Sequence, residues 1–272
     1  MKFESLKKGY PAGAEGRAIV VLLGLILTCG SALYAQNSYN LSRFGEETGL
    51  FFTQPLRWEG CDWLKLGLMG AGTFLAMQAD QPVRTAVQGN LRYSNSVPIE
   101  AGRIWGESYM SPTLAVAFEA HGLLTGNSTT KKIGFEIGQA IIYSAALTQI
   151  LSKSVGRARP NQNLGRAAYQ SFTFSGEDYH SLPGGHSSAA FVLSTVLSKN
   201  VSSGFLKALV YLPAVVTVFA RVYQDYHWTS DDLLGAGIGY VVADWVVNQH
   251  DQQESRIELA SFYPLTIRII IN

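Results

Sequence analysis

Apolar residues recur along most of the chain with the period of helices, and several stretches are apolar on every side, as in the core of a helical bundle. This pattern predicts helices over residues 62–77, 113–124, 129–153, 187–199 and 205–225. Helix-start signals add to it: a capping residue comes just before a proline at Asp80 and at Ser111, Thr129 can cap the long helix, and Ser230 precedes two acidic residues that favour the first turn of a last helix. The sequence therefore predicts an all-α, multi-helix bundle.

The C-terminal residues break this helical pattern. Residues 266–271 are mostly β-branched, which is typical of a strand. Since one strand is not stable alone, we expect it to pair with residues 257–262 or with a partner chain. The sequence therefore predicts a short β tail at the C-terminus.

The N-terminus has the three parts of a secretory signal. Basic residues precede an uncharged apolar run over 18–27, and small residues lead to a cleavage point after Ala35. A membrane span needs about 20 apolar residues, so this run is too short for an anchor. Lipidation at Cys29 is disfavoured because the residue before it is a bulky threonine. We therefore expect a signal peptide over 1–35, a single helical domain over 36–272, and a periplasmic or secreted location.

The low net charge argues against a nucleic-acid partner and leaves contact with a membrane open. The 272 residues carry a formal net charge of +1, and only 15% of them are charged. The chain thus lacks the basic excess that neutralises a nucleic-acid backbone, and we expect no nucleic-acid partner. The longest uncharged runs, 137–152 and 208–220, are shorter than a typical membrane span and equally fit buried helices of a bundle. We favour a soluble or membrane-associated protein over one that spans the membrane several times, and the membrane-embedded alternative stays open.

Three segments at helix ends concentrate residues that carry chemistry. The first is basic, closes the helix over 129–153 and ends in Arg159-Pro160. The second opens the next helix with two glycines before His186, and glycines there let backbone N–H groups approach an anion closely. The third contains Arg221, His227 and Asp231. Each has an ordinary structural explanation, but together they indicate phosphoryl transfer through a histidine.

The spacing within the third segment predicts a specific contact. His227 and Asp231 are four residues apart, so on a helical turn they would share a face. A carboxylate bound to one imidazole nitrogen fixes the tautomer and leaves the other nitrogen free to attack. A capping acid beside an unrelated histidine is the alternative explanation.

The order and spacing of these residues resemble the signature of the type 2 phosphatidic acid phosphatase superfamily, which also includes bacterial non-specific acid phosphatases and vanadium haloperoxidases. That signature is a Lys, then Arg-Pro, then Pro-Ser-Gly-His, then Ser-Arg, a His, and an Asp four residues on. This chain matches it at Arg159-Pro160, at Pro183-Gly184-Gly185-His186, and at Arg221, His227 and Asp231. The resemblance covers about residues 148–239 and implies the all-helical core of that superfamily.

The chain departs from this signature at three positions. The lysine, Lys153, is one residue closer to Arg-Pro than in the family, with Ser152 in its usual place. A slip of one residue turns a helical side chain by about 100°. Gly184 and Ala220 each replace a serine, and each loses a hydroxyl donor worth about 10²-fold in rate at an oxyanion site. We expect these changes to affect efficiency or substrate range more than the type of reaction.

The resemblance implies a role for each site residue. His227 attacks phosphorus and forms a phosphohistidine, Asp231 holds its ring, and His186 protonates the leaving alkoxide and then activates water. The residues implied to bind the phosphate are Arg159, Arg221, Lys153 and the backbone of Gly185. The resemblance implies no metal and no cofactor.

We therefore predict a metal-independent phosphoric monoester hydrolase of the cell envelope, of the acid phosphatase or lipid phosphate phosphatase type. Its substrate would be a phosphorylated small molecule or a lipid or isoprenoid phosphate, because the motifs contact only the phosphate. Three alternatives stay open. One is a vanadium-dependent haloperoxidase-like enzyme, one is a metallohydrolase with His186, His227 and Asp231 as ligands, and one is a catalytically weakened protein that binds phosphate or lipid phosphate.

Overall fold

The computed structural model describes residues 39–174, 176 and 178–261, so the expected signal and its cleavage point lie outside the described residues. The chain divides into two compact units at Trp58 and Glu59. The single domain over 36–272 stays a prediction. In the first unit, α2 (Leu41–Thr53) is followed by the 3-10 helix η1 (Gln54–Arg57). Asn40 caps α2, because its side chain accepts a hydrogen bond from the backbone N–H of Arg43 (3.0 Å).

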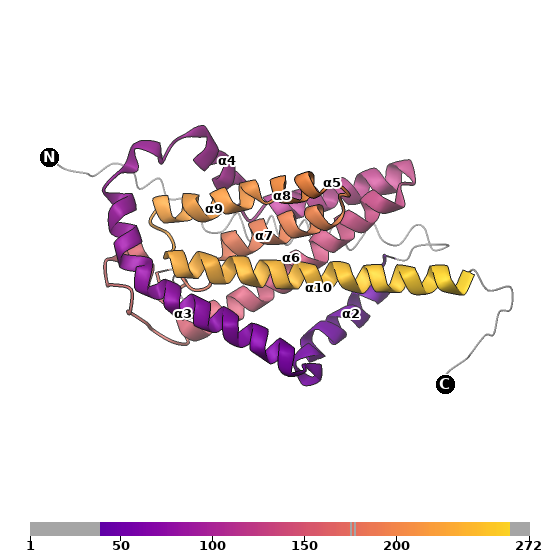
Figure 1. Cartoon of the computed structure of the whole chain (residues 1–272), viewed down its shortest axis with the longest axis horizontal. Coiled ribbons are helices and arrows are strands. Elements are labelled where there is room, and N and C mark those ends of the chain that lie inside the picture. Colours follow the sequence, from indigo (N-terminus) through magenta and orange to yellow (C-terminus); the bar gives the residue numbers. More distant parts are fainter. Residues whose placement is uncertain (1–38, 175, 177, 262–272) are drawn as a thin grey trace. The chain divides into compact units, whose positions relative to one another are not determined.

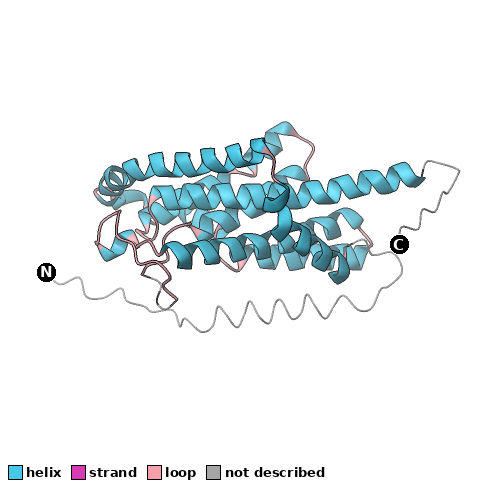
Figure 2. Ribbon diagram, turned by 90° about the horizontal axis from the view of Figure 1, so that it is seen from below, coloured by secondary structure: helices cyan, strands magenta, loops and turns pink. Residues whose placement is uncertain are grey.

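The second unit is helical in its described part, which confirms the all-α prediction (Figures 1 and 2). Its helices are α3 (Gly60–Gln88), α4 (Val97–Trp105), α5 (Met110–Thr125), α6 (Ser128–Val155), α7 (Gly185–Lys199), α8 (Gly204–Leu209), α9 (Leu212–Tyr223) and α10 (Thr229–Ser261), with short 3-10 helices η2 (Leu91–Tyr93) and η3 (Pro160–Gln162). Among the described residues there is no strand, and an isolated β-bridge joins Arg157 to Tyr169.

The core of this unit lies around α7, which packs against α10, α6 and α9. Helix α5 pairs with α6, α4 with α9, and α3 crosses α10 (Figure 1). Glycines on α10 let it approach α7 closely, since a Cβ at Gly239 would collide with the carbonyl oxygen of Ser188. Val192, Leu193, Val196, Ala243 and Val246 form part of the buried core between these helices. This close packing fixes the starts of α7 and α10 beside each other.

Helix α3 corrects one sequence prediction. It runs without a break through Pro82, whereas the pattern predicted a new helix starting at Asp80. The Asp80 side chain does not cap its own helix. It is fully buried and accepts hydrogen bonds from the backbone N–H of Ser230 (2.9 Å) and from Arg157 (2.7 Å). Asp80 resembles the start signal of a helix in the sequence, but its side chain makes tertiary contacts instead.

Other helix ends differ from prediction in smaller ways. Helix α6 is capped by Asn127 rather than Thr129, since the Asn127 side chain accepts from the backbone N–H of Thr130 (3.1 Å). The helix predicted over 205–225 is divided at Val210 into α8 and α9. Helix α4 was not predicted at all.

The C-terminal prediction was wrong where the structure describes it. Residues 257–261, expected to pair as a strand, belong to α10. The sequence there includes Glu258, Leu259 and Ala260, which are strong helix formers. The expected strand over 266–271 lies outside the described residues.

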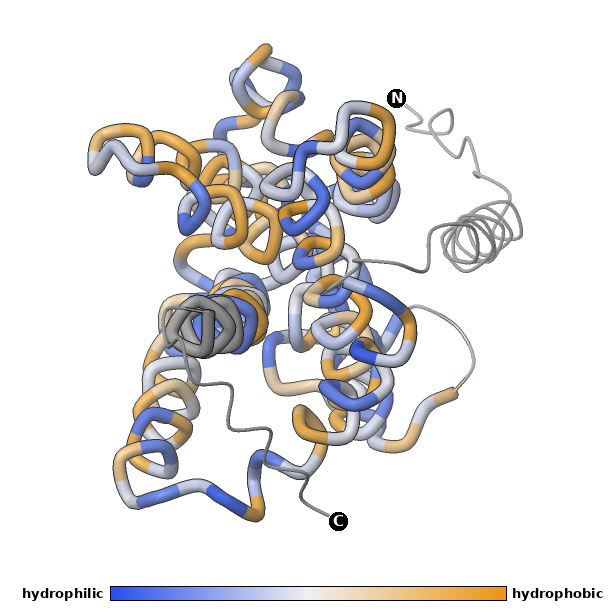
Figure 3. Tube along the Cα trace, turned by 90° about the vertical axis from the view of Figure 1, so that its right-hand side faces the viewer, coloured by the Kyte–Doolittle hydropathy of each residue, from blue (hydrophilic) through white to orange (hydrophobic). Residues whose placement is uncertain are grey.

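Helices α8 and α9 carry large apolar side chains that are exposed. The trace coloured by hydropathy shows hydrophobic residues, in orange, on several helices of the bundle (Figure 3). Residues Gly204–Tyr223 are long and apolar enough to cross a membrane by length and composition, and only 28% of this stretch is buried inside the bundle. Its exposed large apolar side chains are Phe205, Leu206, Leu209, Leu212, Val215 and Phe219. Helix α3 exposes a second set, namely Trp63, Leu64, Leu66, Leu68, Phe74 and Leu75.

Candidate active site

The three motif segments meet where α7 and α10 begin. The backbone N–H of Ser181 donates to the carbonyl oxygen of Arg157 (3.1 Å), which joins the first segment to the second. The backbone N–H of Gly184 donates to the carbonyl oxygen of Asp231 (2.8 Å), which joins the second to the third. Segments far apart in the sequence therefore form one site.

His227 is buried at the centre of this site. Its Nδ1 lies 2.7 Å from the carbonyl oxygen of Ser181, and its Nε2 lies 3.5 Å from Nη1 of Arg159. Because a carbonyl oxygen can only accept, Nδ1 carries the proton and Nε2 keeps its lone pair. Burial, together with the charge of Arg159, lowers the pKa of His227 well below its usual range. The geometry leaves a neutral ring with a nucleophilic nitrogen facing a guanidinium.

Asp231 does not hold the ring of His227, so the predicted contact was wrong. Its carboxylate accepts from the hydroxyl of Ser181 (2.5 Å) and from the backbone N–H of Trp228 (3.0 Å), and it pairs with Arg157 (2.5 Å). The prediction required a helical turn through 227–231, but α10 begins after the histidine. Asp231 therefore fixes Ser181, whose carbonyl group orients the ring.

His186 lies in the first turn of α7, with its ring centroid 6.1 Å from that of His227. Its Nε2 is 3.9 Å from a carboxylate oxygen of Glu107. Burial and the nearby charge of Arg221 lower the pKa of His186 well below its usual range. Because 31% of its side chain is still exposed, the ring remains open to a ligand and to water.

The site holds two guanidinium groups, as predicted for an anion-binding site. Arg221, in the last turn of α9, is buried, and its Nη2 lies 3.2 Å from Glu107. Its Nε is buried and has no acceptor among the residues that the structure describes. Arg159 donates to the carbonyl oxygen of Tyr226 (3.2 Å) and lies over that tyrosine ring. Two cations beside two histidines can bind a doubly charged oxyanion.

The N-terminus of α7 adds backbone donors. Gly184 is the N-cap residue without a side-chain cap, and Gly185 opens the helix, two residues before the predicted start at Ser187. The first N–H groups of a helix have no partner inside it and favour an anion. Beside Gly185 nothing lies within 4 Å of where a Cβ would stand, so a ligand can approach this backbone.

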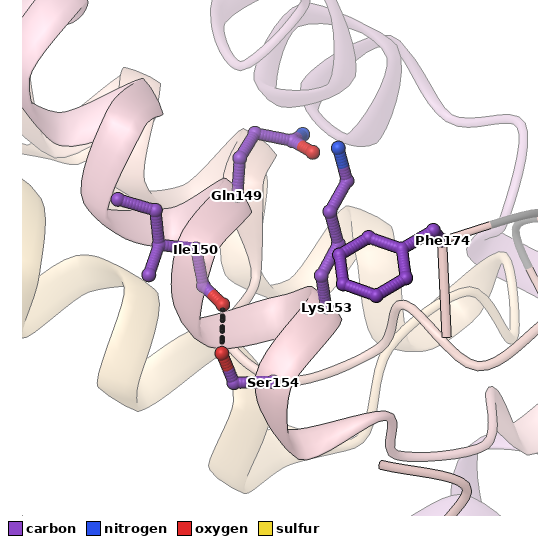
Figure 4. A pocket seen from close by; sticks show the side chains of 5 residues that line it. All are labelled: Gln149, Ile150, Lys153, Ser154 and Phe174. Carbon is purple, nitrogen blue, oxygen red and sulfur yellow. Dashed lines mark hydrogen bonds between the residues drawn. The ribbon is translucent and has the colours of Figure 1, made fainter. Parts of the chain in front are cut away.

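Lys153 is not brought to the site, contrary to the prediction. It lines a shallow hollow of about 210 Å³ with Gln149, Ile150, Ser154 and Phe174 (Figure 4). Ser152, in the family's lysine position, is buried instead. The one-residue slip has turned the lysine onto another face of α6, and within the described part of the chain it contacts neither histidine.

Sequence reasoning missed Arg157 and Glu107. The Arg157 guanidinium is 1% exposed and pairs with Asp80 (2.7 Å) and Asp231 (2.5 Å). The sequence did offer a signal for Arg157, namely that it is a second arginine two residues before Arg159. Glu107 had no local signal, because it pairs with Arg221 across 114 residues of sequence.

The site does not favour the metallohydrolase alternative. Among the described residues, no three His, Cys, Asp or Glu side chains are grouped so that they could hold a metal ion. The carboxylate of Asp231 is taken up by Arg157, Ser181 and Trp228, so it does not join the two histidines as a ligand.

An all-α fold with paired histidines and guanidiniums at a helix N-terminus is typical of proteins that bind phosphate-like anions. Residues 134–255 match the family model of the PAP2 superfamily, and this match includes all three motif segments. This match confirms the resemblance to that superfamily and supports a phosphatase-like function in general. No curated protein and no solved structure matches the chain.

Proposed function

We propose that this protein is a phosphatase that transfers the phosphoryl group first to His227 and then to water. The observation that carries the proposal is the hydrogen bond from Nδ1 of His227 to the carbonyl oxygen of Ser181 (2.7 Å). It holds the ring in the tautomer whose Nε2 has a free lone pair and faces Arg159. A neutral, oriented imidazole beside two guanidiniums is what attack on a phosphate ester requires.

In the first step, Nε2 of His227 forms a bond to phosphorus, and the bond from phosphorus to the ester oxygen breaks. His186 gives its proton to the leaving alkoxide, while Arg159, Arg221 and the first N–H groups of α7 bind the other oxygens. In the second step, neutral His186 takes a proton from water, whose oxygen attacks phosphorus and releases the histidine. Every step uses groups that lie within this site.

The pKa of His186 makes the reaction favour acid. An acid catalyst must start protonated, and burial and Arg221 hold the pKa of His186 well below its usual range, so its protonated fraction rises as pH falls. The pKa of His227 is lowered too, so the nucleophile stays neutral into mildly acidic solution. The incoming phosphate offsets the guanidinium charges and favours the protonated form of His186.

We predict that His186→Ala discriminates between leaving groups. A nitrophenolate leaves without a proton, whereas an alkoxide needs one. We therefore expect kcat/KM to fall by about 10²-fold or more for an alkyl phosphate and much less for a nitrophenyl phosphate. The measurement is phosphate release by the wild-type chain and the variant, with and without chelator and orthovanadate.

The same assay separates the alternatives. Chelator-resistant, vanadate-inhibited release with the leaving-group difference supports the proposal. Equal losses for both esters would refute the acid role of His186. Loss in chelator would favour a metallohydrolase, halide oxidation by the vanadate-loaded protein would favour a haloperoxidase, and vanadate binding without release would favour a binding protein.

We further propose that the protein acts in the cell envelope and contacts the membrane peripherally, with a lipid phosphate as substrate. The exposed apolar side chains of α8 and α9 support this proposal, because so many on one stretch favour contact with an apolar phase. A soluble phosphate ester uses the same phosphate contacts, so these contacts do not decide between the two substrates. The vesicle test below tests the membrane contact itself.

We predict that the protein, produced through the secretory pathway, floats with phosphatidylcholine vesicles. Phe205→Ser with Phe219→Ser removes two side chains that are 75% and 56% exposed and should weaken binding by about tenfold or more. Leu124→Ser, at an 88% exposed site on α5, is the matched control and should bind normally. Equal flotation of all three proteins would contradict membrane contact through α8 and α9.

A further inference from the structure

Gly184 is a glycine for reasons of space rather than of backbone conformation. Its φ of −69° and ψ of 104° are open to any residue. A Cβ at this position, however, would lie 2.5 Å from Oδ1 of Asp232, and 3.1 Å from the Cα of the same residue. The Asp232 carboxyl group therefore fills the space beside the start of α7 where the family's serine side chain would lie.

Only one of the two oxygens of the Asp232 carboxyl group has a hydrogen-bond partner among the described residues. Its side chain is fully buried, and Oδ1 accepts a hydrogen bond from the hydroxyl of Ser187 in the first turn of α7 (2.7 Å). Its Oδ2 is buried and has no hydrogen-bond partner among the residues that the structure describes. An orphaned buried oxygen costs free energy, so its presence beside an anion-binding turn calls for a functional explanation.

The charges around Asp232 are those of the active site. Arg221 from α9 and Arg159 from the loop before η3 both act on this carboxyl group, and both also act on His186 and His227. From α10 itself, Asp231 repels a negative charge at this position. Burial, with that repulsion, raises the pKa of Asp232 well above its usual range. In its protonated form such a carboxyl group carries an O–H donor.

We propose that Asp232 donates a hydrogen bond from its carboxyl O–H to a phosphate oxygen and so replaces the serine hydroxyl that is missing at Gly184. This inference rests on the proposed phosphatase function and adds a phosphate-binding residue to it. No bond to phosphorus forms at Asp232, and its proton stays on the carboxyl group. Ionised Asp232 would instead repel the substrate, so binding is lost as pH rises through its pKa.

Three substitutions at two positions test the proposal, with orthovanadate affinity and kcat/KM measured for each. Asp232→Ala removes the donor and should lower both by about 10²-fold, whereas Asp232→Asn keeps an N–H donor and should stay within about tenfold of wild type. Gly184→Ser alone crowds the carboxyl group and should lower both. Gly184→Ser combined with Asp232→Ala removes that crowding and supplies a hydroxyl group, so it should recover at least about tenfold over Asp232→Ala.

The pH dependence of vanadate binding separates the proposed role of Asp232 from a purely structural one, which would leave this dependence unchanged. The ratio of the vanadate dissociation constants of wild type and Asp232→Asn cancels the titration of vanadate itself. This ratio should be constant in acid and should rise with pH, because only wild type acquires a negative charge at position 232. A protonated-carboxyl band in the infrared spectrum of wild type, absent from Asp232→Asn, should accompany it.

Two results would overturn the proposal. One is an Asp232→Ala protein with wild-type vanadate affinity, and the other is a flat ratio across pH. If Asp232→Ala does not fold, the vanadate affinities of Asp232→Asn and of the double variant still test the proposal. Failure of the proposed function is distinguishable, because in that case wild type releases no phosphate, whereas the vanadate series still tests Asp232.

Discussion

Replacing His227 by alanine should lower kcat for a nitrophenyl phosphate by about 10⁴-fold or more. Under the proposed mechanism His227 is the nucleophile, and among the described residues of the site no other group is placed to attack phosphorus: the second ring, His186, has its centroid 6.1 Å away and lies beside Glu107. Loss of the nucleophile leaves only the binding groups, which hold the phosphate but do not form the intermediate. The measurement is steady-state phosphate release over a range of enzyme concentration wide enough to detect the residual rate.

The control for this variant is His121→Ala, because His121 is exposed and its ring bonds the hydroxyl of Thr130 (3.1 Å), away from the two site histidines. It should leave kcat unchanged. A trapping experiment adds a direct readout: wild type mixed with labelled phosphate ester should give a protein-bound label that is stable in base and labile in acid, and His227→Ala should not. A label that persists in His227→Ala, or activity close to wild type, would show that another residue is the nucleophile.

Local sequence signals were sufficient for the fold class and for the membership of most of the site. The helical period and the glycine at Gly126, which takes a left-handed conformation at the end of α5, depend on neighbouring residues alone. The three motifs also lie at helix ends, and helix ends carry the clearest local signatures. This is why His186, Arg159, Arg221 and His227 could be grouped before their contacts were known.

Contacts between distant segments account for what sequence reasoning got wrong. Asp80 resembles a helix cap in the sequence, but a guanidinium 77 residues away takes its side chain, and α3 continues. The contact predicted from His227 to Asp231 assumed a regular helical turn. The backbone there is irregular, and a carbonyl group from residue 181 occupies Nδ1 instead.

The departures from the family signature also divide into one that local helix geometry explains and one that depends on contacts between distant segments. The displacement of Lys153 from the site has a local explanation, because a slip of one residue along a helix turns the side chain by a fixed angle. The reason for Gly184 could not be predicted, since it depends on which side chain of α10 lies against it. A substitution that looked like a simple loss in the sequence thus has a neighbour that fills the same space.

The second large effect concerns Arg157, which joins the active site to α3. Its guanidinium pairs with Asp231 and Asp80, whose side chains are fully buried, and it donates to the hydroxyl of Ser230 (2.8 Å). Removing one partner from a buried ionic group leaves the other charges without compensation. We therefore expect Arg157→Met to lower the free energy of unfolding by about 3–5 kcal/mol, or roughly 10 °C in Tm.

The matched control is Lys65→Met, which introduces the same residue at a pair that is largely exposed. Lys65 is 77% exposed and lies 3.1 Å from Asp62, so its loss should change the free energy of unfolding by about 0.5 kcal/mol or less. Chemical denaturation of both variants gives the comparison. Similar losses for both would show that the buried pairing contributes no more than a surface contact.

A triple variant separates stability from positioning. Arg157→Met with Asp80→Asn and Asp231→Asn leaves no unpaired charge, so it should recover most of the lost stability. It should not recover activity to the same extent, because a neutral residue 231 holds Ser181 less firmly, and Ser181 orients His227. Recovery of both together would mean that Arg157 acts on stability alone, whereas recovery of stability alone would identify Asp231 as a positioning residue for the nucleophile.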